Sequence, residues 1–400
     1  MKKSLLLLLA TVILSNCVYP QWYYQNSGTT SALYDVFCLN KDTVFAAGDN
    51  GIFKTVNGGD AWTNIYSSGA IESIFFVDNN VGYATGTSVE IHNLIIKTVN
   101  GGDIWTTLNS GLSSSYYGLN CLYFVNDTIG YIGAANEGIL VKTINEGINW
   151  DSLNLGQIED ITDIYFINKD TGIITSLYST YKTYDGANTW IQKNNHGGRD
   201  IFFCNDSVGY VSGAFILKTT NSGETWIISD TIDNPQLQTV FFTSLDTGYV
   251  AGWDPFFYYG GVYGTTINSG MTWNIDTIPE KITSIYFVNS QVGYAVCEDG
   301  TILKTENGGI TGNIQEKGIN EKTNNIKIFQ NYDQIEFIFP HKINKDMSFC
   351  LYDVKGNTVK SLNNIFSNKI ILNKKNITKG IYIYEIIANN KIIYTDKLFI

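Results

Sequence analysis

A glycine-rich pattern returns along most of the chain, and it constrains the fold more than any other feature. Its first copy is Lys54-Thr55-Val56-Asn57-Gly58-Gly59-Asp60-Ala61-Trp62. Further copies cover Thr98–Trp105, Thr143–Trp150, Thr183–Trp190, Thr219–Trp226 and Thr266–Trp273, and a seventh, with glycine in place of tryptophan, covers Thr305–Gly312. Because the copies recur about every 40 residues, they indicate a repeat architecture.

Each repeat is predicted to contain four short strands. The first strand ends in phenylalanine and an apolar residue, as in Phe76-Val77, and the second opens with Gly-Tyr, as in Gly82-Tyr83. The third runs into Lys-Thr, and the tryptophan begins the fourth. Four strands per repeat are typical of a β-propeller blade. In this alignment Phe37-Cys38 ends the first strand of the first repeat, so Cys38 and Cys204 are equivalent small buried residues.

The two ends of the repeat region predict how the propeller closes. Trp22-Tyr23-Tyr24 reads as a fourth strand with no blade before it, whereas the seventh repeat stops at Gly312 without a fourth strand. We therefore expect an all-β, seven-bladed propeller over residues 22–312, in which the N-terminal strand completes the last blade beside Thr301–Thr305. Such closure removes two exposed sheet edges.

The pattern Thr55-x-Asn57-x-Gly59-x-x-Trp62 resembles the Asp-box (BNR repeat) of sialidases, sortilin-like receptors and the photosystem II stability/assembly factor family. The Asn side chain and the glycine favour a tight turn, which threonine and tryptophan can hold against the blade. In those families the box is structural, which implies the same role here. Ala187 replaces the glycine of the fourth copy, so we expect that turn to be looser. The structural residues are Thr55, Asn57, Gly59, Trp62, Asn100, Gly102, Trp105, Asn145, Gly147, Trp150, Asp185, Trp190, Asn221, Gly223, Trp226, Asn268, Gly270 and Trp273.

The N-terminus and the charge balance suggest an exported protein. Lys2-Lys3 followed by the apolar run Leu5–Leu14 predicts a signal peptide over residues 1–21, with lipidation of Cys17 as the alternative. No other segment is apolar and long enough to predict a membrane span. The net charge is −11, which disfavours nucleic acid as a partner. The remaining cysteines have no CxxC spacing, so we expect free thiols and no metal.

After a polar linker over residues 313–325, residues 326–400 predict a small, immunoglobulin-like β-sandwich. Within it, residues 349–356, 377–382 and 397–400 resemble the type A C-terminal sorting domain of the type IX secretion system, found in Bacteroidetes-type bacteria. The motif residues are Tyr352, Asp353, Gly356, Gly380, Ile381, Tyr382 and Lys397. The family's Pro-Asn-Pro is replaced by Gln330-Asn331-Tyr332. The resemblance implies partnership with the type IX secretion machinery and a secreted or outer-membrane surface protein. An ordinary accessory domain is the alternative.

No residue constellation carries a recognisable chemistry. A sialidase needs three arginines to bind the substrate carboxylate, and Arg199 is the only arginine. Glu72, Glu159, Asp160 and Asp163 are the carboxylates that a glycosidase could use, although charged loops are usually solvated edges. The three histidines lack ligand spacing, and no cofactor motif occurs. We therefore expect no enzyme activity, no metal and no cofactor. A glycoside hydrolase or lyase with carboxylates at the propeller axis is the alternative.

Loops that vary between repeats lie on the face opposite the recurrent turns, where a rigid scaffold usually hosts binding. Thr87–Asn93 and Asn109–Tyr117 lengthen two of them, and an aromatic loop at residues 253–259 either anchors a ligand or folds into the axis. The candidate binding residues are Trp253, Phe256, Phe257, Tyr258, Tyr259, Tyr116, Tyr117 and Arg199. We expect a non-catalytic protein that binds a surface protein or glycan. An assembly factor is a third hypothesis, which the acidic charge disfavours.

Overall fold

The computed structural model describes residues 22–112, 118–135, 138–156, 158, 160–230, 236–253, 260–309, 327–330, 334–338, 347–353, 357–365, 369–375, 377, 381–388 and 391–399. The chain divides into two compact units, residues 1–313 and 314–400. Among the described residues, no helix has the length and hydropathy that crossing a membrane requires.

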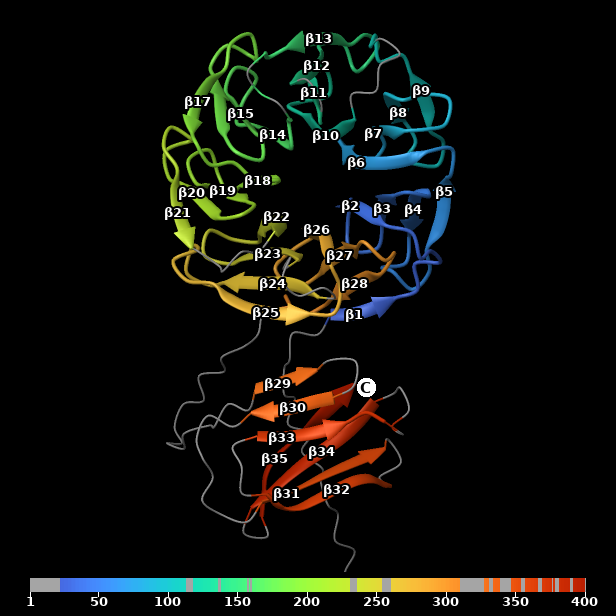
Figure 1. Ribbon diagram of the computed structural model, residues 1–400. Coiled ribbons are helices and arrows are strands. Elements are labelled where there is room, and N and C mark those ends of the chain that lie inside the picture. The colour runs from blue at the N-terminus through green and yellow to red at the C-terminus, as the bar shows by residue number, and fades with distance from the viewer. Residues whose placement is uncertain are drawn as a thin grey trace, which may run out of the picture. The chain divides into compact units, whose positions relative to one another are not determined.

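The first unit is a ring of seven four-stranded antiparallel sheets around a common axis (Figure 1). Blades one to three contain β2 (Leu33–Cys38), β3 (Val44–Gly48), β4 (Gly51–Thr55) and β5 (Thr63–Tyr66); β6 (Ala70–Phe76), β7 (Gly82–Thr87), β8 (Leu94–Thr98) and β9 (Thr106–Leu108); and β10 (Leu119–Phe124), β11 (Gly130–Ala134), β12 (Ile139–Thr143) and β13 (Asp151–Asn154). Blades four and five contain β14 (Asp163–Phe166), β15 (Gly172–Thr175), β16 (Thr180–Thr183) and β17 (Ile191–Asn194); and β18 (Asp200–Phe203), β19 (Gly209–Ser212), β20 (Ile216–Thr219) and β21 (Ile227–Asp230).

Blade six contains β22 (Gln236–Phe242), β23 (Gly248–Trp253), β24 (Gly261–Thr266) and β25 (Asn274–Ile278). Blade seven joins β26 (Ile282–Phe287), β27 (Gly293–Cys297) and β28 (Ile302–Thr305) to the N-terminal strand β1 (Trp22–Gln25). Trp22 pairs with Thr305 and Tyr24 with Leu303. The predicted seven-bladed propeller, closed by its N-terminal strand, is therefore confirmed.

Where the first two strands of a blade pair, a phenylalanine ring at the end of the first strand packs against a glycine at the start of the second. A Cβ atom on Gly82 would lie 2.6 Å from the Phe76 ring, and one on Gly209 would lie 2.7 Å from Phe203, so only glycine fits beneath the aromatic ring. The first blade solves the same problem differently, because Cys38 pairs there with Val44. A small thiol faces a larger valine where other blades have Phe and Gly.

This pairing corrects the alignment of the first repeat. Cys38 occupies the position of Phe76, whereas Cys204 follows the end of β18 and occupies the position of Val77. The equivalence of Cys38 and Cys204 is therefore wrong. The valine at the start of β3 removed the Gly-Tyr landmark by which the repeats were aligned. The five cysteines among the described residues are all unpaired.

The hydrophobic cores lie between neighbouring blades, and stacked aromatic rings join each blade to the next. Tyr83 of blade two stacks on Phe124 of blade three at 4.0 Å, and Tyr131 of blade three stacks on Phe166 of blade four at 4.1 Å. Both tyrosines are fully buried. Since each offset-stacked pair crosses a blade boundary, the tyrosine of the Gly-Tyr pattern stabilises the ring rather than its own sheet.

The second unit contains seven strands in two sheets. One sheet has the order β29 (Lys327–Gln330), β30 (Gln334–Ile338), β33 (Lys369–Asn373), and the other β32 (Thr358–Ile365), β31 (Met347–Asp353), β34 (Ile381–Ala388), β35 (Lys391–Phe399). Buried side chains of both sheets form a single core that includes Phe337, Phe349 and Tyr384. A small β-sandwich is therefore confirmed, with one strand, β32, that the sequence did not predict.

Candidate functional site

The recurrent turns are held by one hydrogen-bond scheme that repeats around the ring. In the first turn, the Gly59 N–H donates to Thr55 Oγ1 at 3.0 Å, and the Ala61 N–H donates to Asn57 Oδ1 at 3.0 Å. The Thr55 hydroxyl itself donates to Asn57 Oδ1 at 2.8 Å. Threonine and asparagine therefore satisfy backbone groups of the turn, which agrees with the structural role expected for them.

The fourth turn is not looser in its hydrogen bonding, which corrects the expectation drawn from Ala187. The Ala187 N–H donates to Thr183 Oγ1 at 3.1 Å, and the Thr189 N–H donates to Asp185 Oδ1 at 2.9 Å. Ala187 has φ of 74°, so it adopts the left-handed conformation of the glycine that it replaces. Bonds from Thr189 lower the pKa of Asp185 to about 2. The turn keeps its geometry because these bonds offset the backbone strain.

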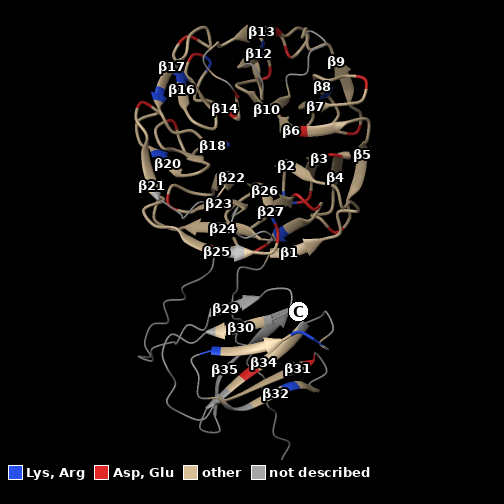
Figure 2. Cartoon of the chain, in the orientation of Figure 1, with Lys and Arg blue, Asp and Glu red and all other residues tan. Residues whose placement is uncertain are grey.

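Five of the recurrent turns are also tied to the preceding blade by the lysine of the Lys-Thr pattern. Lys54 Nζ donates to the Gly101 carbonyl at 2.8 Å, and Lys142 Nζ donates to the Gly186 carbonyl at 2.7 Å. Figure 2 shows basic residues on third strands such as β16 and β20. This role of the lysine was not predicted from the sequence, although lysine precedes every threonine of the pattern but one.

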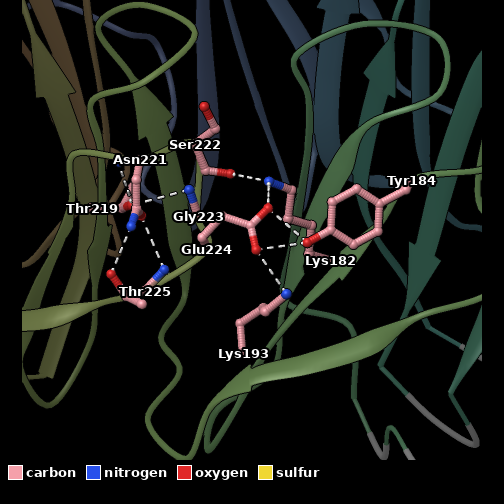
Figure 3. Close-up of polar contacts among 9 residues, drawn as sticks. All are labelled: Lys182, Tyr184, Lys193, Thr219, Asn221, Ser222, Gly223, Glu224 and Thr225. Carbon is pink, nitrogen blue, oxygen red and sulfur yellow. Dashed lines mark hydrogen bonds and ion pairs between the residues drawn. The ribbon is translucent and has the colours of Figure 1, made fainter.

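The densest of these contacts joins blades four and five (Figure 3). Lys182 Nζ lies 2.7 Å from both the Ser222 carbonyl and Glu224 Oε1, and Lys193 Nζ lies 2.8 Å from Glu224 Oε2. Tyr184 donates to the same carboxylate at 2.7 Å. The bond from Lys182, followed by those from Lys193 and Tyr184, lowers the pKa of Glu224 to about 2. All these groups are used in packing, so the recurrent turns offer no free site.

The inner strands carry a second ring of hydrogen bonds. One position of each inner strand holds a small or acidic residue, namely Asp35, Ser73, Cys121, Asp163, Asp200, Thr239 and Ser284. Four of them accept an amide hydrogen from the next blade: Ile74 N to Asp35 at 2.9 Å, Ile201 N to Asp163 at 2.8 Å, Val240 N to Asp200 at 2.7 Å and Ile285 N to Thr239 at 3.3 Å. We call these seven residues the latch ring.

The carboxyl groups of the latch ring are easier to protonate than ordinary ones. Burial raises the pKa of Asp35 to about 6, against hydrogen bonds from Ile74 and Ser284 that lower it. Burial and the charge of Asp200 raise the pKa of Asp163, and burial raises that of Asp200, with a side-chain hydrogen bond between the two. Asp163 is thus a partly buried residue of β14 and not part of a solvated loop, which corrects the sequence interpretation.

The residue immediately before each latch-ring residue lies outside the regular strand pairing of its blade. In blades one, two, three, six and seven a β-bulge falls there. In blades four and five the position directly precedes the strand. Its occupants include a phenol, a carboxylate, two carboxamides, two hydroxyls and a guanidinium: Tyr34, Glu72, Asn120, Thr162, Arg199, Gln238 and Thr283. We call them the bulge ring.

The bulge ring lies at the face opposite the recurrent turns. Turns and first hairpins share one face, since the Gly58 N–H donates to the Asp42 carbonyl at 2.9 Å, and the inner strands begin at the other. Bulges re-aim side chains and often occur beside functional sites. Within the described residues, the Arg199 guanidinium and the Glu72 carboxylate have no hydrogen bond or ion pair, and both are partly buried.

Burial acts on both of these charges. It lowers the pKa of Arg199, and burial together with the Asp49 carboxylate raises the pKa of Glu72. A partly desolvated charge without a partner is costly in the free protein and becomes favourable when a complementary group is bound. Arg199 was a candidate from the sequence, and Glu72 was considered only as a catalytic acid. The remaining bulge-ring residues were missed, although comparing equivalent positions of the repeats would have found them.

Several other candidates lie outside the described residues, namely Tyr116, Tyr117, Phe256, Phe257, Tyr258, Tyr259 and Glu159. Trp253 is described, partly buried, with Lys281 Nζ 5.8 Å from its ring centroid. No group of three metal-ligating side chains occurs among the residues that the structure describes.

Of the motif residues in the C-terminal unit, three have described side chains. Tyr352 donates to Glu385 at 3.1 Å, Asp353 accepts the Asn357 N–H at 2.9 Å and Tyr382 is buried. Gly356 and Gly380 lie outside the described residues, and Ile381 and Lys397 belong to β34 and β35. Asp353 and Asn357 thus cap a turn, and the two tyrosines have packing roles.

Comparison with known proteins places the first unit among β-propellers. No family model and no curated protein matches the sequence. The structure is similar to YCF48 from Cyanidioschyzon merolae, with 18% identity, a TM-score of 0.56, and 71% of this chain and 98% of that chain covered. A structure of YCF48 bound to D1 peptide gives 18% identity, a TM-score of 0.57 and coverage of 71% and 94%.

A second kind of similar structure is enzymatic. The GH74 enzyme of Niastella koreensis has 13% identity and a TM-score of 0.58, with 86% of this chain and 61% of that chain covered. The chain thus spans less than two thirds of that enzyme. At these identities the similarity establishes the seven-bladed propeller fold and leaves the function to the residues of the site.

Proposed function

We propose that this protein is a non-catalytic binding propeller that captures a surface protein or glycan through the face that carries the bulge ring. The observation that carries the proposal is the contrast between two neighbouring positions of each inner strand. The latch ring is conserved in role and hydrogen-bonded to adjacent blades, whereas the bulge ring varies from blade to blade. Variable side chains on a rigid repeated scaffold are where repeat proteins bind partners.

Arg199 is the proposed anchor of this face. It is the only arginine in the chain, and its guanidinium has no partner within the described residues. An arginine fork matches a carboxylate in two parallel hydrogen bonds, and arginines are frequent among residues that dominate binding energy. A protein segment that presents a carboxylate, either an acidic side chain or a chain terminus, would fit it.

The comparisons are compatible with this function. One similar propeller, YCF48, is described as bound to D1 peptide, so a propeller of this fold can hold a peptide. For the present chain we carry over only the class of partner, a peptide or protein segment. Trp253, which lies at the end of β23 on the same face, is a proposed apolar contact for such a segment.

We further propose that the C-terminal unit serves as the type IX sorting domain that its motif resembles. The N-terminal residues 1–21 would direct export, and the mature protein would be secreted or attached to the outer-membrane surface. The sandwich with its own core supports a separately folded tail. Fusion of residues 314–400 to a periplasmic reporter in a type IX-competent bacterium tests the assignment. Retention of the reporter in the periplasm would refute it.

A second candidate function rests on Asp163 and Asp200. Both carboxyls have pKa values raised by burial, a raised pKa is what a general acid needs at neutral pH, and similar propellers include GH74 enzymes. Both carboxylates, however, accept backbone amides of the next blade, which favours a structural role. Release of reducing sugar from neutral polysaccharides, abolished in Asp163→Asn and Asp200→Asn variants that still fold, would establish the enzyme.

The binding proposal is tested with the immobilised full-length protein and surface extracts of the cells that produce it. Arg199→Ala is expected to weaken capture by roughly 30-fold or more, as removal of a dominant contact does. Lys169→Ala is the matched control, because Lys169 is an exposed cation in the hairpin between β14 and β15, paired with Asp170 at 2.8 Å. Equal capture by wild type and Arg199→Ala would overturn the proposal.

A further inference from the structure

A cavity lies between the first two blades, apart from the inner strands. Its volume is about 340 Å³, at the lower end of the range for small-molecule sites. Blade one contributes Tyr66 and Ser68 from the end of β5 and the loop after it, and blade two contributes Ser88 and Glu90 from the β7–β8 loop and Thr107 from β9. The cavity opens on the same face as the bulge ring, because it is formed by connections of that face.

The cavity exists because blade two departs from its neighbour in one loop. Six residues separate β7 from β8, whereas two separate β3 from β4. The longer loop is held in shape by Ser88, whose N–H donates to the Ile91 carbonyl at 2.8 Å and whose Oγ accepts the Ile91 N–H at 3.0 Å. This connection differs in length from blade to blade, and in blade two its internal hydrogen bonds make it a built feature of the surface.

Gly69 brings the loop of blade one against this feature. A Cβ atom at that position would lie 2.5 Å from the Thr87 carbonyl oxygen and 3.1 Å from the Ser88 Cβ. Only glycine therefore lets the chain between β5 and β6 approach the end of β7. This close approach places Ser68 beside the β7–β8 loop.

Four polar side chains that line the cavity are available for a ligand. Within the described residues, Tyr66 Oη, Ser68 Oγ, the Glu90 carboxylate and Thr107 Oγ1 make no hydrogen bond. Burial raises the pKa of Tyr66, so its phenol remains a neutral hydroxyl. Val89, Ile91 and Leu94 also line the cavity, and Val89 and Ile91 are exposed to solvent. The cavity combines several free hydroxyls with an aliphatic surface.

We propose that this cavity binds one neutral sugar residue of a glycan. A pyranose ring offers hydroxyls at its edge, which both donate and accept, and apolar C–H groups on its faces. The hydroxyls of Tyr66, Ser68 and Thr107 complement the edge, since hydroxyls also do both, and the Glu90 carboxylate accepts a further hydroxyl. Val89, Ile91 and Leu94 complement the C–H face. This inference deepens the proposed function, since it uses the same face and the glycan class of partner.

The charge of the site selects among sugars. Glu90 lines the cavity, and the net charge of the chain is −11. Sialic and uronic acids would be repelled. A cationic peptide gains little from a single exposed carboxylate, because solvent screens such pairs. A neutral sugar satisfies more of the groups that are present.

The test is a titration of the full-length protein with four neutral sugars, in which saturation-transfer NMR detects binding. The sugars are methyl β-glucoside, methyl β-galactoside, methyl α-mannoside and N-acetylglucosamine. Hexalysine is the cationic probe. At least one neutral sugar is expected to bind with a millimolar dissociation constant. Tyr66→Phe and Thr107→Val should each weaken binding about five- to tenfold through the loss of one hydrogen bond. Ser68→Trp, at an exposed loop position, should fill the cavity and abolish binding.

Asp60→Asn is the control, because Asp60 is an exposed carboxylate on a recurrent turn at the other face. It should leave the sugar affinity unchanged. Absence of binding by all four sugars, or binding that survives Ser68→Trp, overturns the proposal. Hexalysine binding that is lost in Glu90→Gln, without sugar binding, overturns it in favour of a cationic ligand. The capture experiment with Arg199→Ala uses another residue and another readout, so failure of sugar binding is distinguishable from failure of the partner-binding face.

Discussion

At the residue scale, each recurrent turn requires two successive residues in the left-handed region. The second of them is glycine in all copies but one, and the sequence pattern identified it. The first is Gly58, Gly101, Gly186 or Gly308 in four copies, but Glu146, Ser222 and Ser269 in the others, with φ of 60°, 62° and 60°. The sequence pattern could not reveal that the first residue must also be left-handed, because three copies have glutamate or serine there, which adopt this conformation poorly.

Ser222→Gly is therefore expected to stabilise the protein. Left-handed φ costs a residue with a Cβ atom about 1–2 kcal/mol, and the greater freedom of glycine in the unfolded chain offsets part of that gain. We expect the free energy of unfolding to rise by about 0.5–1 kcal/mol in urea denaturation. Thr220→Gly, two residues earlier in the same turn but without positive φ, is the control and should be destabilising. A fall in stability for Ser222→Gly would show that no strain resides there.

At the scale of the element, the third strand of a blade is the part that binds the next blade. Its lysine reaches the neighbouring turn in blades one to five, and in blade six Tyr263 donates to the Gly309 carbonyl at 3.0 Å instead. The strand was predicted from its Ile-x-Lys-Thr pattern, but its partner could not be. The lysine and its acceptor are about 40–50 residues apart in sequence, and only the ring brings them together.

Glu224 allows this contact to be tested through pH. Its carboxyl pKa is about 2 in the folded protein against 4.5 in the unfolded chain. The ion pairs with Lys182 and Lys193 therefore contribute stability that is present above about pH 4.5 and is lost as the pH falls towards 2. Since the Glu224 side chain is 41% exposed, solvent screening reduces the contribution to about 1 kcal/mol.

Glu224→Gln should accordingly lower the free energy of unfolding by about 1 kcal/mol at neutral pH and leave it nearly unchanged near pH 2. Urea denaturation at both pH values measures the difference. Asp170→Asn is the control, because Asp170 pairs with the exposed Lys169 inside a single hairpin. A Glu224→Gln deficit of the same size at both pH values would mean that packing, not charge, holds blades four and five together.

At the scale of the whole molecule, the ring is closed by a strand that comes from the other end of the domain. Trp22 in β1 makes edge-to-face contacts with Phe287 at 5.9 Å and with Tyr263 at 5.8 Å. The corresponding tryptophans of blades two to six contact the phenylalanine of their own inner strand in the same way. The N-terminal strand therefore reproduces the packing of an ordinary fourth strand.

Trp22→Ala should weaken this closure and lower the free energy of unfolding by about 3 kcal/mol, within the range for large aromatic side chains replaced by alanine. Chemical denaturation monitored by circular dichroism measures the loss. Ile227→Ala is the control, because Ile227 follows Trp226 in β21 but is 62% exposed, and it should cost less than about 0.5 kcal/mol. Equal stability of the two variants would argue that β1 does not hold the ring closed.

The sequence by itself determined the number of blades, the recurrent turns and the strand that closes the ring. These follow from local patterns, because a repeat displays the same turn chemistry and the same strand periodicity each time that it occurs. Only the tertiary structure decided the latch ring, the bulge ring and the cavity between blades one and two. Each of these depends on residues from different blades, such as Asp163 with Ile201 or Tyr66 with Glu90, which are brought together only by the packing of one blade on the next.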